Sequence, residues 1–190
     1  MVFDEEIHDI ASRNHIHLAN DLGKYFAEPL GSGAYTLPLM AVLFWTSGKN
    51  NPKNKEVALN GIKAFVVSGG FSFAAKQIFH RERPGDKDPS DPFSWHGPAV
   101  YFKYSSFPSG HTATIFAVAT VLSNSYKEKK WVGIASYSLA LLTGLSRVYD
   151  NEHWMSDVIA GAVLGTYIGH CISNRKPSKN KLKPIRWKYF

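Results

Sequence analysis

Five long stretches without Asp, Glu, Lys or Arg divide this 190-residue chain, and they limit its possible folds more than any other feature. They cover residues 29–48, 64–75, 104–126, 131–146 and 158–174. They are rich in Ala, Leu, Ile, Val and Gly, and apolar and polar residues do not alternate along them as they do in strands. The pattern therefore predicts helices. Most stretches need a few residues beyond their charged borders to reach the roughly 20 residues that cross a bilayer. We therefore predict an all-α integral membrane helical bundle with about five transmembrane helices.

The connectors between these stretches differ in charge. If five helices alternate across a bilayer, three connectors on one side hold 13 of the 22 basic residues and two of the 15 acidic residues. The basic residues are Lys49, Lys53, Lys55, Lys127, Lys129, Lys130, Arg175, Lys176, Lys179, Lys181, Lys183, Arg186 and Lys188. Because Lys and Arg mark the cytoplasmic side, we expect an outer N-terminus and a cytoplasmic tail. The alternative is a soluble all-α globule whose apolar stretches are core helices.

The length favours a single core, with three segments. We expect an N-terminal amphipathic segment over 1–33, a helical-bundle domain over 34–174 and a basic cytoplasmic tail over 175–190. The segment 1–33 fits equally well on the membrane or on the bundle. Residues 1–9 lack the basic start and apolar run of a signal peptide, which suggests a longer native chain. The oligomeric state is left open.

Small residues recur on the last helix. Gly161, Gly165 and Gly169 lie four residues apart and so share one face, where they allow another helix to approach closely. The single cysteine, Cys171, excludes an intramolecular disulfide framework. The net charge of +7 permits an anionic partner, but no nucleic-acid recognition fold accompanies it.

Three clusters with chemical potential lie on the predicted outer side. In the first, Lys76 and Arg83 are seven residues apart, so one helix would present both cations on one face and end at Pro84. Two such cations suit an anion or serve as interfacial anchors. In the second cluster, Ser109 and Gly110 lie at the start of a predicted helix, next to His111. The free backbone N–H groups at a helix start can bind an anion.

The third cluster contains Arg147, His153 and Asp157. His153 and Asp157 are four residues apart, so on a helix the carboxylate would fix the imidazole tautomer and leave the other ring nitrogen free to attack. Arg147 offers a planar donor fork suited to phosphate oxygens. Taken separately, these residues fit a structural hydrogen bond and an interfacial anchor equally well.

Together, Lys-x6-Arg-Pro, Pro-Ser-Gly-His and Ser-Arg-x5-His-x3-Asp resemble the three-part signature of the phosphatidic acid phosphatase type 2 superfamily, over about residues 35–172. The resemblance implies that His153 is the nucleophile forming a phosphohistidine, that Asp157 orients it, and that His111 protonates the leaving oxygen and then activates water. It also implies that the phosphoryl oxygens are held by Lys76, Arg83, Ser109, Gly110 and Arg147.

The resemblance further implies a phosphatase of the membrane branch, acting on a lipid phosphate monoester or pyrophosphate at the outer face of the cytoplasmic membrane. We expect no metal and no cofactor, and we interpret the loop acids as solvated: Asp86, Asp88, Asp91, Asp150 and Glu152. The alternatives are a soluble acid phosphatase, a vanadium-dependent haloperoxidase and a non-catalytic lipid-binding protein. The expected partners are the lipid substrate and the membrane, without nucleic acid.

Overall fold

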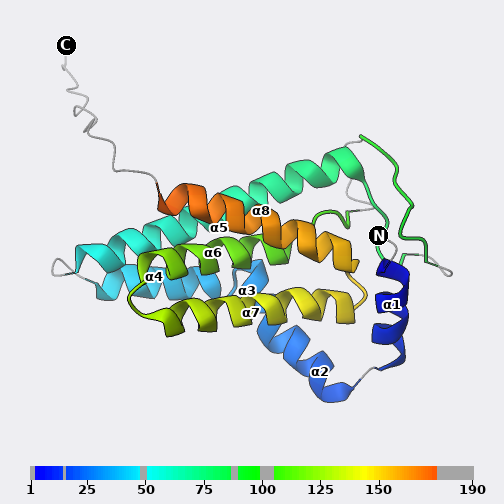
Figure 1. Cartoon of the computed structure of the whole chain (residues 1–190), viewed down its shortest axis with the longest axis horizontal. Coiled ribbons are helices and arrows are strands. Elements are labelled where there is room, and N and C mark those ends of the chain that lie inside the picture. Colours follow the sequence, from blue (N-terminus) through cyan, green and yellow to red (C-terminus); the bar gives the residue numbers. More distant parts are fainter. Residues whose placement is uncertain (1–2, 15, 48–50, 87–89, 99–104, 175–190) are drawn as a thin grey trace, which may run out of the picture.

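A computed structural model describes residues 3–14, 16–47, 51–86, 90–98 and 105–174. These residues are mainly helical, with an isolated antiparallel bridge between Arg81 and Trp95, so the all-α fold class is confirmed. The elements are α1 (Asp4–Arg13), α2 (His17–Leu22), the π-helix η1 (Gly23–Ala27), α3 (Glu28–Ser32), α4 (Thr36–Thr46), α5 (Pro52–Phe79), α6 (Gly110–Ser125), α7 (Lys130–Tyr149) and α8 (Met155–Ser173). In Figure 1, α4 to α8 run roughly along the long axis, and α1 lies at the end where α7 turns into α8.

Local chemistry explains where the helices begin and end. The first apolar stretch, 29–48, forms two helices, because Gly33 adopts a left-handed conformation (φ 94°) that ends α3. α5 begins at Pro52. The preceding residue, Asn51, is its N-cap, and the side chain of Asn51 accepts a hydrogen bond from the backbone N–H of Asn54. At its other end His80 is left-handed (φ 40°) and closes α5.

The centre of the bundle is α6, which packs against α5, α7 and α8 and is buried over most of its length. The predicted glycine stripe of α8 faces α6 directly. A Cβ at Gly161 would lie 2.5 Å from the carbonyl oxygen of Ser109, and one at Gly169 would lie 2.5 Å from that of Ala117. Side chains larger than hydrogen do not fit there, so the expected close helix approach is confirmed.

Apolar side chains cover much of the outer surface of the bundle. Of the described helices, α5 and α8 are long and apolar enough to cross a membrane, and only 33% of the apolar window in each is buried. Trp45, Ile134 and Tyr167 are more than two-thirds exposed, at 81%, 69% and 68%. Core helices of a soluble protein bury such windows, so this surface favours a lipid environment.

The N-terminal helices dock on the bundle. α1 contacts α7 and α8, where the His8 ring lies 5.5 Å from that of Trp154, between centroids. α3 packs on α6, and Leu30 joins a buried cluster with Ile115, Ala119 and Ala140. The segment boundaries at 33/34 and 174/175 stay predictions, and the tail over 175–190 lies outside the described residues.

Candidate active site

A cavity of about 330 Å³ opens at the end of the bundle where α5 ends and α6 begins. Its walls come from α3, α5, α6 and the loops before α6 and α8. Five of the eight predicted site residues line it, namely Lys76, Arg83, Gly110, His111 and His153. The sequence clusters, which are separated by up to 77 positions, therefore converge on one cavity.

The two cations of the first cluster reach the cavity from different segments. Lys76 lies in the last turn of α5 and donates hydrogen bonds to the carbonyl oxygens of Ser105 and Ser106. Arg83 lies beyond the helix, because α5 ends at Phe79. The prediction that one helix face presents both cations is therefore wrong. The left-handed conformation of His80 ends α5 three residues before Arg83, so Arg83 reaches the cavity from the following loop.

The second cluster forms the predicted helix start. Ser109 is the N-cap of α6, and its Oγ accepts hydrogen bonds from the backbone N–H and the hydroxyl of Thr112, at 3.5 and 2.9 Å. Ser109 is fully buried, so its hydroxyl serves the helix while Gly110 and His111 line the cavity. A Cβ on Gly31 of α3 would lie 2.7 Å from that of His111, so α3 packs directly against this histidine.

The third cluster pairs a histidine with a carboxylate. His153 precedes α8, in the turn after α7, and its Nδ1 lies 3.7 Å from Oδ2 of Asp157 in the first turn of α8. The two are neighbours as expected, but the prediction that both lie on one helix is wrong, because α8 begins at Met155. The carboxylate of Asp157 caps α8 by accepting from the backbone N–H of Trp154, at 3.0 Å.

Burial sets the protonation state of His153. The residue is 3% exposed, and desolvation disfavours its charged form, which lowers its pKa to about 4. The Oγ of Ser106 lies 3.4 Å from Nδ1 and also donates to Asp157. With Nδ1 facing Ser106 and Asp157, Nε2 of a neutral ring is the nitrogen left for chemistry.

Two residues that sequence reasoning missed hold Asp157 in place. Arg81 is fully buried and donates from one end of its guanidinium to Asp157 and from the other to Asp4 of α1, at 2.8 Å. Asp4 also accepts from the backbone N–H and the hydroxyl of Ser156. Arg81 lies inside the first motif, but no local signal links it to Asp4, because the pair is 77 positions apart.

Residues 58–181 match the family model described as the PAP2 superfamily, which is well over half of the chain. The chain belongs to the PAP2 superfamily. The sequence-based assignment of the family is confirmed.

Individual relatives agree with this membership. The lipid A 1-phosphatase of Porphyromonas gingivalis is 36% identical over 138 residues, which are 70% of this chain and 27% of that protein. This chain thus spans about a quarter of the length of that relative. The undecaprenyl-diphosphatase of Sulfolobus acidocaldarius is 26% identical over 170 residues, 87% of this chain and 75% of that protein.

A solved structure gives the same result for the fold. The transmembrane PAP2-type phosphatidylglycerolphosphate phosphatase of Bacillus subtilis superposes with a TM-score of 0.68 at 25% identity, over 89% of this chain and 82% of that one. The helical bundle described above is therefore the fold of a transmembrane PAP2 phosphatase.

In this member of the PAP2 superfamily, carboxylates hold two of the predicted phosphate-binding arginines. Arg83 pairs with Glu152. Arg147 is 4% exposed and forms an ion pair with Asp150 at 2.7 Å. A second carboxylate, that of Glu28, lies 4.0 Å from the Arg147 guanidinium. Arg147 thus lies behind the cavity lining. Two of the acids that we interpreted as solvated, Asp150 and Glu152, are partly exposed and also pair with these arginines.

Aromatic residues near the site play different parts. Trp154 is 1% exposed and donates from Nε1 to the carbonyl oxygen of Glu82 at 2.9 Å, so it is packed in the interior. Trp95 stacks near Phe79 and Phe107, with centroids 5.9 and 5.4 Å away. Asp88, one of the loop acids considered above, lies outside the described residues.

Proposed function

We propose that this protein hydrolyses a lipid phosphate monoester or pyrophosphate through a phosphohistidine intermediate, with its site at the outer face of the cytoplasmic membrane. The observation that carries the proposal is the convergence of His111, His153, Lys76 and Arg83 on one cavity at the N-terminus of α6. Phosphoryl transfer needs positioning and charge stabilisation, which two cations and helix N–H groups supply.

In the first step, Nε2 of His153 attacks the phosphorus atom and forms a P–N bond while the bond to the leaving oxygen breaks. His111 donates a proton to that oxygen, so an alcohol leaves as the neutral alcohol and a lipid phosphate leaves with one negative charge fewer. Asp157 orients the ring and stabilises its growing positive charge, because its carboxylate lies 3.7 Å from Nδ1. Lys76 and Arg83 stabilise the charge on the equatorial oxygens.

In the second step, His111 removes a proton from water as the water oxygen attacks phosphorus. The P–N bond breaks, inorganic phosphate leaves, and both histidines return to their starting states. In this proposal Arg147 and Gly110 complete the phosphate site, and Ser109 contributes by capping the helix start that faces the phosphate. Arg147 reaches the phosphoryl group when Asp150 releases it, since the two carry an ion pair at 2.7 Å.

The lipid substrate is proposed from the position of the site. The cavity lies at one end of a bundle whose outer surface is apolar, so an acyl or prenyl chain can stay in the bilayer while its headgroup enters. The names of the relatives include a lipid A phosphatase and an undecaprenyl-diphosphatase, which support both a monoester and a pyrophosphate. A phosphate-release screen over both classes in detergent identifies the lipid.

The membrane topology is likewise a proposal. We propose about five spans, in which α4, α5, α6, α7 and α8 cross the cytoplasmic membrane within the bundle domain 34–174. The segment 1–33 caps the outer end, and the basic tail 175–190 lies in the cytoplasm. Carbonate extraction tests the embedding, and release of the protein without detergent contradicts it.

The decisive test of the mechanism is His153→Ala in the purified protein. We expect phosphate release to fall by at least about 1000-fold, because no second group replaces the nucleophile. His170→Ala is the matched control, since His170 is exposed on the last turns of α8. Lys76→Ala should also weaken inhibition by vanadate, which mimics the transferring phosphoryl group. Wild-type turnover by His153→Ala contradicts the proposal.

A further inference from the structure

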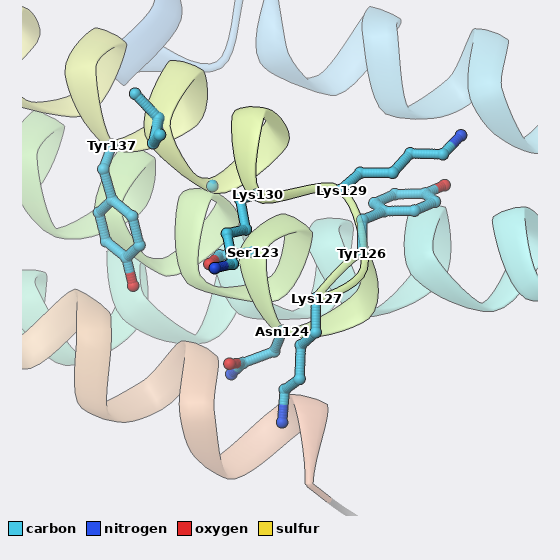
Figure 2. A pocket seen from close by; sticks show the side chains of 9 residues that line it. Ser123, Asn124, Tyr126, Lys127, Lys129, Lys130 and Tyr137 are labelled. Atoms are coloured by element: carbon cyan, nitrogen blue, oxygen red, sulfur yellow. The ribbon is translucent and has the colours of Figure 1, made fainter.

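A second cavity, of about 490 Å³, lies at the opposite end of the bundle from the candidate active site. It is formed where α6 ends and α7 begins, and Figure 2 shows seven of its residues labelled. α6 spans the 16 residues from Gly110 to Ser125, so about 24 Å separates the two cavities along its axis. The second cavity therefore belongs to a separate site.

Its lining is basic. Lys127, Lys129 and Lys130 are among its lining residues, and no carboxylate is among the lining residues that the structure describes. The neighbouring acid, Glu128, is engaged elsewhere, because Lys53 donates to it at 2.6 Å. In Figure 2 Lys127 extends to the same side as Asn124, whereas Lys129 extends away beside Tyr126. The uncompensated charge favours an anion.

Two further groups in this cavity lack the partners that polar groups normally have. Nδ2 of Asn124 is buried and has no hydrogen-bond partner in the described part of the chain. Lys129 precedes α7, and its side chain makes no cap hydrogen bond. Within the described residues, the N–H groups of Lys130 and Trp131 therefore have no side-chain acceptor, whereas that of Val132 donates to the carbonyl oxygen of Lys129 at 2.9 Å. An anion at this position would accept from both groups, which relieves the cost of an unpaired buried donor.

The surroundings indicate that the anion is carried by a lipid. Ile134 and Tyr137 form apolar walls, and Ile134 is 69% exposed on the outer face of α7. Trp131, one residue into the same helix, is 67% exposed, which is typical of a residue at the membrane interface. We propose that this cavity binds the phosphate of an anionic phospholipid, with the acyl chains lying against α7.

Lipid binding at this cavity is independent of the proposed hydrolysis. Its test measures bound lipid, so a negative result for binding leaves the proposed hydrolysis untouched, and the reverse also holds. The full chain is incorporated into nanodiscs of phosphatidylcholine with phosphatidylglycerol, and co-purifying lipid is counted by native mass spectrometry. We expect the protein to retain phosphatidylglycerol preferentially, and K127Q/K130Q to reduce that retention at least about fivefold. Hydrolysis of a water-soluble phosphate monoester should stay unchanged, because both lysines are exposed and far from His153.

The matched control is Lys55→Gln, which removes one charge at the same end of the bundle but outside the cavity, where Lys55 lies over the Phe44 ring. It should keep the preference. Titration with inorganic phosphate tests whether the cavity binds the free anion rather than a lipid headgroup. If millimolar phosphate displaces the retained phosphatidylglycerol, the site binds free phosphate and the lipid assignment is overturned. An equal loss in Lys55→Gln shows diffuse attraction to the basic surface, and unchanged retention in K127Q/K130Q overturns the site.

Discussion

The imidazole of His153 combines burial with a nearby carboxylate, and these act on its protonation in opposite directions. Burial lowers the pKa, whereas the hydrogen-bonding and charge of Asp157 raise it, and burial prevails. The neutral form is the one that carries a lone pair on Nε2. The same carboxylate stabilises the ring once it becomes cationic on attack, so a ring that is neutral at rest need not be a poor nucleophile.

The pH dependence of hydrolysis tests this balance. A pKa of about 4 keeps His153 neutral at pH 7 and protonates it only as the pH falls through about 4. We therefore expect the acid limb of kcat/KM that belongs to His153 to lie near pH 4, well below the ordinary value of 6.5. The substrate phosphate itself titrates near pH 6, so substrates with different phosphate pKa values are the control. A limb near 6.5 that does not move with the substrate contradicts the prediction.

The ion pairs of the arginines give a second prediction at this scale. Glu152 holds Arg83, and a substrate phosphate must compete with that carboxylate. Glu152→Gln removes the competing charge, so we expect KM for a soluble phosphate ester to fall by a factor of about 2–5 with kcat little changed. Steady-state kinetics at fixed ionic strength measures both constants. Glu128→Gln is the control, since Glu128 lies at the other end of the bundle.

At the scale of elements, the site depends on how tightly helices approach one another. α8 carries Asp157 at its start and can reach α6 only because its facing residues are glycines. α1 contributes through Asp4, which holds Arg81 and thereby the carboxylate of Asp157. The N-terminal segment is therefore part of the catalytic end and not a separate appendage.

Gly165→Ala tests the approach of α6 and α8. A Cβ at Gly165 would overlap the backbone carbonyl of Ala113, which cannot rotate away. We expect a loss of about 1–3 kcal/mol in the free energy of unfolding, seen as a lower midpoint in thermal unfolding in detergent. Gly70→Ala on α5 is the control, because no atom lies within 4 Å of its Cβ position. That variant should be neutral or slightly stabilising, and equal losses in both would contradict close packing.

Asp4→Asn tests the docking of α1. The change leaves one end of the buried Arg81 guanidinium without a charged partner, and breaking a buried pair costs about 3–5 kcal/mol. We expect lower thermal stability together with a lower kcat, because Asp157 loses its support. Asp9→Asn removes an exposed partner of Arg13 on the same helix and should change little. If kcat is unchanged in Asp4→Asn, the link from α1 to Asp157 is absent.

The sequence predicted the helices better than the path of the chain between them, and five of the eight predicted site residues line one cavity. Apolar stretches and the spacing of Gly161, Gly165 and Gly169 are local patterns, so the helices and their contact followed from them. The end of α5 at Phe79 did not, because it depends on His80 and on the buried partners of Arg81. The contact of Asp4 with Arg81 has no local signal, since tertiary packing alone creates it.

Across the whole molecule, charge and chemistry are separated along the long axis. The candidate active-site cavity and α1 lie at one end, and the start of α5 and the α6–α7 connection lie at the other, where Lys53 meets Glu128 (Figure 1). The described lysines of the basic connectors thus gather at the end away from His153, namely Lys53, Lys55, Lys127, Lys129 and Lys130. This arrangement is the one that the positive-inside rule associates with a cytoplasmic face.

Cysteine labelling in intact cells tests the orientation that this separation predicts. In a Cys171→Ser background, Glu5→Cys and Lys127→Cys place single exposed thiols at opposite ends of the bundle. We expect a membrane-impermeant maleimide to label Glu5→Cys from outside, and to label Lys127→Cys only after permeabilisation, because the bilayer excludes the charged reagent. Denatured samples control for the reactivity of each thiol. The reverse pattern would place hydrolysis on the cytoplasmic face, and labelling of both sites in intact cells would contradict the membrane-spanning bundle itself.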